Sequence, residues 1–514
     1  MVIIKNIGSL TVDKIIKISL LTFSLLIFPL CLNAQVFFKV SREFDLEWQQ
    51  KYYNCYNSVK PVLPLQYGGG LSSCNDTVIQ QYRGFKKAAV WSKEHFFEKD
   101  FLYFCKNDTI TKQKISLCVN PIFVFESRNL KDESPHKNYS KNTRGFEVFG
   151  QISDRIAYYT AFYENQGYFP DYVLQYINTY GVIPGQGVGK EYKTDGLDWA
   201  WATGNVYVKA SENLEFVLGY GKNFIGSGYR SIVLSDESFN YPYLRAQYKL
   251  KNFYYNVVWA QMQSRGFGFE PYENHRYRYA SYHTIGYLSN FCHGFNVSLI
   301  EGVMWRNTKD GAYTTKPRML MFWPVAGLPT LFNGFDGKDN IFWAADIGFC
   351  PLKHVKIYGQ ARFDGSDGYS EDGRHFGGQV GVHFFDILGF WVNNDRICWH
   401  VQAELTCNDV KKPNPKVDDV LFGHYAEPLQ YSGTTERVVL SEITFFKRLE
   451  GEFKYLDGCD RKLCGIKCSL VANPTTRWKI YVGMLSRTPK GIETSKYVYF
   501  GTCICPINFY DKDL

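Results

Sequence analysis

The stretch GKNFIGSGYRS, residues 221–231, combines glycines with a lysine and an arginine, which are the residue types of a phosphate-binding loop. A Walker-type loop requires Gly-Lys followed by Ser or Thr, because the hydroxyl must reach the magnesium ion. Here Lys222 is followed by Asn223, and Phe216 stands where the first glycine belongs. The dinucleotide-binding pattern fails as well, since Ser231 replaces its third glycine. The stretch therefore does not predict nucleotide binding.

Two other interpretations of this stretch stay open. Glycine allows left-handed or closely approached backbone, which favours a tight loop that folds inward. Alternatively, Lys222, Tyr229 and Arg230 contact an acidic glycan, because a guanidinium group pairs well with carboxylates.

A second candidate for glycan binding is FEPYENHRYRYA, residues 269–280, which contributes Tyr272, Arg276 and Arg278. Sugar rings can stack their C–H faces on aromatic rings, and acidic sugars can pair with arginine. The competing interpretation is an aromatic girdle of a membrane barrel with its usual flanking charges.

Other chemistry has weaker support in the sequence. FDGSDGYSEDG, residues 363–373, crowds carboxylates including Asp364 into one loop, but it lacks the twelve-residue calcium pattern. A solvated turn is therefore expected, and a weak calcium site is the alternative. There is no GxSxG elbow and no HExxH pair. We expect no enzyme activity, no cofactor and no metal site.

The elements that position these residues are predicted to be strands, because apolar and polar residues alternate with a period of two. In HVKIYGQARF, residues 354–363, Val355 and Ile357 share one face, whereas Lys356 and Tyr358 share the other. WHVQAELT, residues 399–406, shows the same alternation. A soluble sandwich would also produce this pattern, so alternation by itself does not identify the fold.

The lengths of the connections distinguish the two folds. Twelve strands are predicted at residues 115–127, 145–152, 155–164, 199–209, 214–221, 243–250, 253–262, 280–290, 295–304, 341–350, 355–364 and 377–386. Their connections alternate strictly between long and short, which is typical of outer-membrane barrels and not of Greek-key sandwiches. Five more strands are expected at 396–406, 445–455, 464–472, 477–485 and 496–505. Since bacterial barrels have even strand numbers, one strand is missing or in excess, and we place the error after residue 387.

The N-terminal part of the chain has a different organisation. Residues 1–34 combine lysines with an apolar run and end in a small residue, Ala34, which predicts a cleaved signal peptide. Residues 35–112 are expected to form a periplasmic or plug segment, and residues 113–514 the barrel.

The composition fits an exported barrel better than a soluble core. Aromatic residues make up 17% of the chain, with 38 Tyr and 40 Phe, and the net charge is +8. Tyrosine in this abundance favours barrel girdles. Beyond the signal segment there is no apolar run long enough for a membrane-spanning helix. Most of the 14 cysteines are expected to pack as small apolar residues, although Cys55–Cys74 or Cys105–Cys118 bridges stay open.

Several segments resemble a known family of outer-membrane barrels. GKNFIGSGYRSIVLSDESFNYPYLRAQYKL, IGYLSNFCHGFNVSLIEGVMW, VKIYGQARFD and FGHYAEPLQY are similar to the Wzi capsule-assembly and RemB gliding-motility proteins, with the RemB branch closer. The resemblance extends from about residue 144 to residue 455. It implies an all-β, transmembrane antiparallel β-barrel of about 18 strands, closed from below by N-terminal structure.

The resemblance also implies work at the surface of a Gram-negative bacterium. We expect attachment or assembly of capsule or exopolysaccharide, or a role in gliding motility; the alternative is an outer-membrane channel or transporter component. The expected partners are outer-membrane lipid, surface polysaccharide and other motility or secretion proteins of the outer membrane, and not nucleic acid. Because one scaffold serves all these functions, the sequence does not choose among them.

Overall fold

The computed structural model describes residues 59–62, 102–107, 114–130, 138–153, 155–194, 196–264, 276–289, 293–305, 308–309, 312–313, 319–333, 339–365, 375–388, 397–409, 423–424, 427–431, 433–446, 448–458, 461–473, 478–489 and 494–504. The predicted signal peptide, the 410–422 segment and most of the 35–112 segment lie outside these residues.

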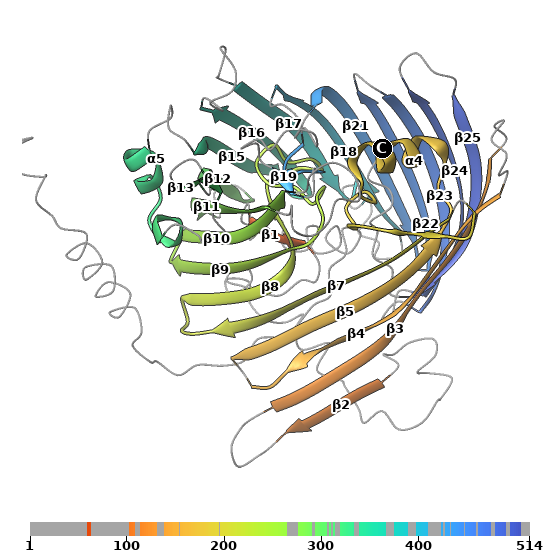
Figure 1. The fold of residues 1–514 in the computed structure, drawn as a ribbon, viewed down its shortest axis with the longest axis horizontal. Helices are drawn as coiled ribbons and strands as arrows, with labels where there is room; N and C mark the ends of the chain where they lie inside the picture. The colour runs from red at the N-terminus through yellow and green to blue at the C-terminus, as the bar shows by residue number, and fades with distance from the viewer. Residues whose placement is uncertain are drawn as a thin grey trace, which may run out of the picture.

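The chain folds into a closed antiparallel β-barrel (Figure 1). The main sheet has 21 strands, of which 18 form the ring and three pair with one neighbour only. The ring closes where β25 pairs with β3, at Tyr497–Leu130 through Ile504–Phe123. The ring strands are β3 (Lys114–Leu130), β4 (Asn138–Gln151), β5 (Ile156–Gly167), β7 (Gly196–Lys209), β8 (Leu214–Ile225), β9 (Tyr241–Leu250), β10 (Phe253–Ser264), β11 (Arg276–Ser289), β12 (Phe295–Trp305), β15 (Asn340–Leu352), β16 (Val355–Asp364), β17 (His375–Phe385), β18 (Ile397–Asn408), β21 (Gly433–Phe445), β22 (Leu449–Gly458), β23 (Arg461–Asn473), β24 (Trp478–Pro489) and β25 (Ser495–Ile504).

The three remaining strands of this sheet are short. Strand β2 (Leu102–Asn107) pairs with the start of β3, beyond the point where β25 ends, so it extends the seam of the barrel. Strand β1 (Val59–Val62) pairs with residues 222–225 of β8, and β6 (Lys190–Tyr192) pairs with the start of β7. Two small hairpins, β13 (Thr308–Lys309) with β14 (Ala312–Tyr313) and β19 (Gly423–His424) with β20 (Glu427–Pro428), lie in connections.

The helices also belong to connections. Helix α4 (Asp171–Tyr180) lies between β5 and β6, and a 3₁₀ helix, η4 (Met319–Phe322), and helix α5 (Leu328–Asn333) lie between β14 and β15. None of the helices in the described ranges is long and apolar enough to cross a membrane.

The two faces of the strands are reversed relative to those of a soluble protein. On β16, the apolar Ile357 is 49% exposed on the outer wall, whereas Lys356, Gln360 and Arg362 point inward and are buried. Strand β24 repeats this arrangement, with Ile480 outside and Lys479 inside. The predicted alternation is thus confirmed, and an apolar exterior with a polar interior is the arrangement that a lipid surrounding selects.

Many tyrosines lie on the inner wall and not only in girdles at the rim. The Tyr254 ring lies over Gly286, its direct cross-strand partner, at a place where any Cβ would collide with the ring. Tyr358 covers Gly381 in the same way. Pairs of this kind recur around the ring: Tyr243–Gly219, Phe342–Gly302, Tyr481–Gly501 and Tyr499–Gly483. Part of the aromatic excess is therefore explained by inward packing of aromatic rings over glycines.

The predicted alternation of long and short connections is confirmed, and the missing strand is β21. The expected strand at 445–455 corresponds to β22 with the turn before it, and it shares only Phe445 with β21. Strand β21 escaped detection because Val438, Val439 and Leu440 are consecutive apolar residues, so its period of two is hidden. The predicted error after residue 387 is confirmed.

No disulfide joins the seven strand cysteines whose side chains the structure describes. Cys105 lies opposite Ser116, and Cys118 lies opposite Tyr103, so the Cys105–Cys118 disulfide is not formed. Cys350 and Cys503 are buried, as small apolar residues often are. The possible Cys55–Cys74 bridge lies outside the described residues.

Candidate functional site

The glycine-rich stretch 221–231 leads into a loop that folds into the barrel. The backbone N–H groups of Tyr229 and Arg230 donate to the two carboxylate oxygens of Glu404 on β18, at 2.7 and 3.0 Å. Ser227 donates its N–H and its hydroxyl to Asp346 on β15, at 3.1 and 2.9 Å. Gly228 is required by close approach, because a Cβ there would collide with the Glu404 carboxylate. The backbone does surround an anion, as in a phosphate-binding loop, but the anion belongs to the barrel wall.

Side chains of the same loop and of the wall reinforce this attachment. Arg230 donates to both oxygens of Glu436 on β21, at 2.7 and 3.2 Å, and lies over the rings of Tyr229 and Tyr431. Arg362 on β16 donates to the Ile232 carbonyl at 2.8 Å. Bidentate pairs between arginine and carboxylate are the stronger kind of ion pair, so the loop is fixed at several points.

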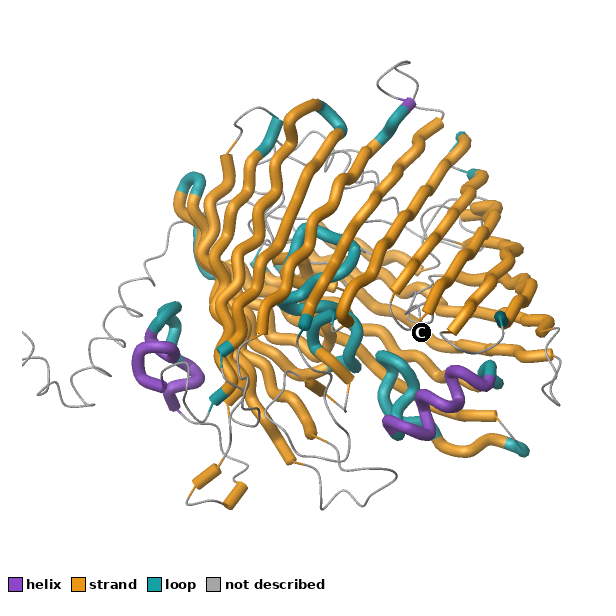
Figure 2. The backbone as a smooth tube through the Cα atoms, turned by 90° about the horizontal axis from the view of Figure 1, so that it is seen from above, coloured by secondary structure: helices purple, strands orange, loops and turns teal. Residues whose placement is uncertain are grey.

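Two further inward segments are attached to this loop. Ser235 N–H donates to the Leu429 carbonyl and Tyr431 N–H to the Ser231 carbonyl, both at 2.7 Å, which joins residues 226–240 to residues 427–431. Glu427 accepts from Gly185 N–H at 2.6 Å, which joins the segment after α4. Figure 2 shows these loops within the ring of strands. We call residues 183–187, 226–240, 423–424 and 427–431 together the luminal plug.

The neutral side chain of His424 connects the luminal plug to the barrel wall. Its Nδ1 accepts from Gln263 N–H at 2.9 Å, so Nε2 carries the proton and donates to the Asn240 carbonyl at 3.0 Å. Burial, with a smaller contribution from the nearby Arg278 and Lys222, lowers the pKa of His424 to about 3. The imidazole is therefore uncharged at neutral pH.

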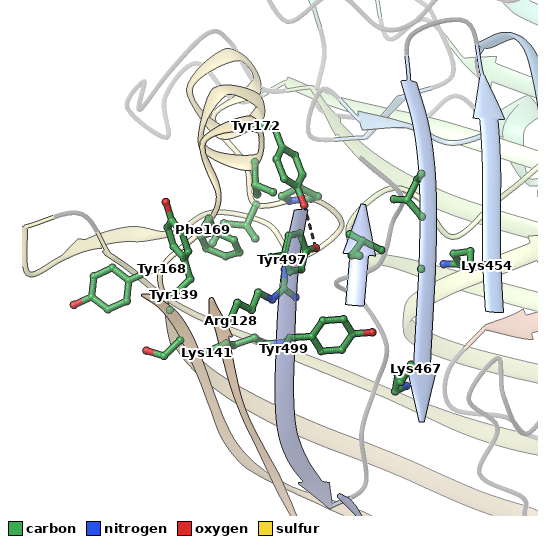
Figure 3. A pocket seen from close by; sticks show the side chains of 18 of the residues that line it. Arg128, Tyr139, Lys141, Tyr168, Phe169, Tyr172, Lys454, Lys467, Tyr497 and Tyr499 are labelled. Atoms are coloured by element: carbon green, nitrogen blue, oxygen red, sulfur yellow. Dashed lines mark hydrogen bonds between the residues drawn. The ribbon is translucent and has the colours of Figure 1, made fainter. Parts of the chain in front are cut away.

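A pocket lies beside the luminal plug, between helix α4 and the inner wall near the seam (Figure 3). Helix α4 begins after Pro170 and ends at Gly181, which has a left-handed conformation and donates its N–H to the Ile177 carbonyl. Val173 and Ile177 are four residues apart and bury one face of α4 in an aromatic cluster. The position of α4 over the wall is thereby set, and the space beneath it is about 1030 Å³, open solvent at its mouth included.

The lining of the pocket is aromatic and basic. Aromatic rings come from Tyr139 on β4, from Tyr497 and Tyr499 on β25, and from the chain leading into α4. The cations in the lining are Arg128, Lys141, Lys454 and Lys467, and among the described lining residues Glu452 is the one carboxylate. The remaining residues that line it are Ser140, Gly167, Tyr168, Phe169, Tyr172, Val173, Ile183, Pro184, Gln186, Leu463, Gly465, Ile466 and Leu485.

Contacts within the lining hold the rings in place. Tyr172 and Tyr497 meet through their hydroxyls at 3.4 Å (Figure 3). Arg128 donates to the Tyr497 hydroxyl at 3.4 Å and lies 5.4 Å from the centre of its ring. Lys467 pairs with Glu452 at 3.0 Å. Arg128 also pairs with Glu126, which lies outside the lining, at 2.5 Å. The lining itself carries four cations and one carboxylate, so positive charge is in excess there.

This arrangement suits binding better than a reaction. Fixed tyrosine rings offer faces for stacking, and the cations offer donors for carboxylate, sulfate or phosphate groups. A hydrolytic pair of carboxylates would require a second acid close to Glu452, and the described lining supplies none. Over the described ranges, no group of three or more His, Cys, Asp or Glu could hold a metal ion.

The residues predicted from the sequence lie mainly in and around the luminal plug. Tyr229 and Arg230 come together there, and Lys222 is buried nearby, with its Nζ donating to the Asp236 carbonyl at 2.9 Å. Arg278 is buried on β11 near His424. Arg276 is described only as the first residue of β11, opposite Ser264, and Tyr272 lies outside the described residues.

None of the predicted residues that the structure describes lines the pocket, and Tyr229 lies next to one lining residue. Lys454, a lining residue, has its Nζ 5.4 Å from the centre of the Tyr229 ring. The sequence analysis missed the lining itself, although Tyr497 and Tyr499 share the inner face of β25 in the alternating pattern. From the acidic stretch at 363–373, Asp364 is the buried last residue of β16 and pairs with Arg362 at 2.6 Å. The expected solvated turn that follows it, from residue 366 on, lies outside the described residues.

The fold, with its apolar outer face and polar inner face, defines this chain as a β-barrel of the outer-membrane type. No family model matches the chain, and no curated protein matches it. Among solved structures, it is similar to the outer membrane protein OpdK of Pseudomonas aeruginosa, at 8% identity over 75% of this chain and 97% of that one, with a TM-score of 0.42.

Two other similar structures have different descriptions. OccAB2 of Acinetobacter baumannii is 9% identical over 76% of this chain and 97% of that one, with a TM-score of 0.40. Wzi of Escherichia coli, described as a carbohydrate-binding β-barrel involved in group 1 capsule assembly, is 12% identical over 75% of this chain and 84% of that one, with a TM-score of 0.41. At these values the likeness does not establish the Wzi/RemB family or choose a function.

Proposed function

We propose that this protein binds an acidic polysaccharide at the cell surface, in attachment or assembly of capsule or exopolysaccharide or in gliding motility. The observation that carries the proposal is the pocket under α4, whose tyrosine rings and excess of cations match a sugar chain that bears carboxylates. The predicted signal peptide, residues 1–34, would export the chain, and residues 35–112 would form a periplasmic or plug segment.

The luminal plug supports binding over transport. The plug is held by buried carboxylates at several points, which favours a filled lumen over an open one. The polar inner wall favours the alternative, a channel or transporter component, because such a wall is also typical of porins.

Polysaccharide retention tests the proposal. The full chain, purified in detergent, is titrated with the cell's own surface polysaccharide, and a double variant Lys141→Gln, Tyr499→Leu is compared with it. We expect saturable binding to the wild type and an affinity about tenfold lower for the variant, equivalent to ~1.4 kcal/mol. Binding should also weaken as salt is raised, since screening reduces charge pairing.

A lysine outside the pocket supplies the matched control. Lys462 on β23 is 64% exposed, so Lys462→Gln removes a similar charge without touching the lining. This control should bind like the wild type. If the wild type retains no polysaccharide, the proposal is wrong; if both variants bind as well as the wild type, the site lies elsewhere, and an Arg276→Ala, Arg278→Ala variant tests the loop predicted from the sequence.

A further inference from the structure

The connection between β12 and β15 carries a segment that packs against the outside of the barrel wall. Residues 319–333, here called the wall flap, read MLMFWPVAGLPTLFN and contain no charged side chain. Figure 2 shows helix α5 outside the ring of strands. Most long connections of a barrel extend into water, so an apolar connection folded down along the wall needs an explanation.

An outward-facing carboxylate attaches the wall flap. Glu301 on β12 lies on the same face as Leu299, which is exposed on the outer wall, but Glu301 itself is fully buried. It accepts from the N–H groups of Gly327 at 2.7 Å and Thr330 at 3.1 Å, and also from the Thr330 hydroxyl. Trp343 on β15 adds a hydrogen bond to Thr330 at 3.1 Å. At the start of α5, the backbone N–H groups of Gly327 and Thr330 are therefore satisfied by the barrel wall.

Apolar contacts complete the attachment. Met321 and Leu320 of the wall flap pack in one cluster with Trp305 and Val303 of β12 and Ile341 of β15. These strand residues are buried although they share the outward face of their strands. The wall flap thus covers the part of the outer wall nearest the long connections.

The covered area directly adjoins the apolar surface of the barrel. Leu299 pairs with Ile285 in register, and both are exposed, one outward position away from the covered Glu301. From Phe295 to Leu299 is four residues, or about 13 Å of strand, whereas the apolar band of an outer-membrane barrel is about 25 Å tall. The uncovered face of β12 is therefore too short to span the band by itself.

The outer surface of the wall flap is apolar, like the part of the membrane-facing band that β12 leaves uncovered. Met319 is 80% exposed, Leu331 79% and Phe332 60%, and Phe322 and Val325 are also exposed. A backbone segment can enter a bilayer only where its polar groups are satisfied, and Glu301 meets this requirement for the start of α5.

We propose that the wall flap lies in the membrane, on the side of the long connections, with Met319, Leu331 and Phe332 against lipid acyl chains. It replaces the strand surface that it covers and shields the Glu301 carboxylate, which would be costly if it faced lipid directly. This inference is independent of what the pocket binds.

Photo-crosslinking to lipid tests this inference. Benzoylphenylalanine is introduced at position 331 of the full chain, which is then folded into dioleoylphosphatidylcholine vesicles and irradiated. The faster migration of unheated protein on a denaturing gel confirms that the barrel has formed. We expect a lipid adduct at position 331 with a yield comparable to that at position 299 on the uncovered wall, and position 332 provides a second measurement if the first variant does not fold.

Val188, which is exposed in the connection between β5 and β7, is the matched control and should give no lipid adduct. If position 331 behaves like position 188 while position 299 gives an adduct, the wall flap faces water and the inference is overturned. An adduct of two protein chains at position 331 would also overturn it, because a second copy would then cover the wall flap.

Discussion

At the scale of single residues, carboxylates on the barrel wall organise the connections. Glu404 and Asp346 point inward and accept from backbone N–H groups of the luminal plug, and Glu301 points outward and does the same for the wall flap. A charged acceptor forms stronger hydrogen bonds than a neutral one, and a buried carboxylate is stable only where such donors surround it.

Replacing Glu404 tests this role. Glu404→Gln removes the charge and turns an amide NH₂ towards the N–H groups of Tyr229 and Arg230. We expect a loss of about 1.5–3 kcal/mol in the free energy that holds the loop in place. Hydrogen exchange of residues 226–240 should rise accordingly. The control Glu164→Gln affects an exposed carboxylate 3.9 Å from Arg144 and should leave this exchange unchanged; equal exchange in both variants would contradict the role of Glu404.

At the scale of elements, the luminal plug is stable because its segments hold one another. His424 connects the β19–β20 hairpin to β10 and to the end of the 226–240 loop. Protonation at Nδ1 would remove the acceptor for Gln263 N–H and place a charge near Arg278 and Lys222.

The luminal plug should therefore loosen in acid. The pKa of His424 is about 3 in the folded plug, against 6.5 ordinarily, so the released segment binds more protons between these values. The contribution of His424 to stability is complete above pH 6.5 and declines as the pH falls towards 3. The hydrogen-exchange rate of residues 423–431, relative to the rate of the unfolded chain, should increase as the pH falls through this window. In the His424→Gln variant this increase should be smaller.

An exposed histidine provides the control for this pH dependence. His293 lies in the turn before β12, so His293→Asn should keep the wild-type profile. A His424→Gln protein with an unchanged pH profile would show that another group is responsible.

At the scale of the whole molecule, a ring of strands with its lumen occupied should conduct ions poorly. In planar bilayers at neutral pH we expect little steady current through the wild type. Glu404→Gln combined with Glu436→Gln weakens two attachments of the 226–240 loop, so the conductance should increase. A wild type that conducts steadily would instead favour the channel alternative.

The sequence by itself determined the barrel. The alternation in residues 354–363 and 399–406 gave the two faces of the strands, and the alternating connections separated a barrel from a sandwich, because both features depend on local geometry. Strand β21 was missed because apolar residues lie on both of its faces. Without alternation, the sequence pattern does not show which side chains point inward.

Only the tertiary structure decided the sites. The pocket joins Arg128 and Tyr139 to Lys467 and Tyr497, which are brought together by closure of the ring at β3 and β25. The sequence predicted cations and aromatics in residues 221–231, but not that Glu404, more than 170 residues away, would occupy the donors of that loop. Likewise, only the structure shows that Glu301 holds residues 319–333 against the outer wall. Contacts between residues so distant in sequence leave no periodic signal, and they form only when the sheet closes.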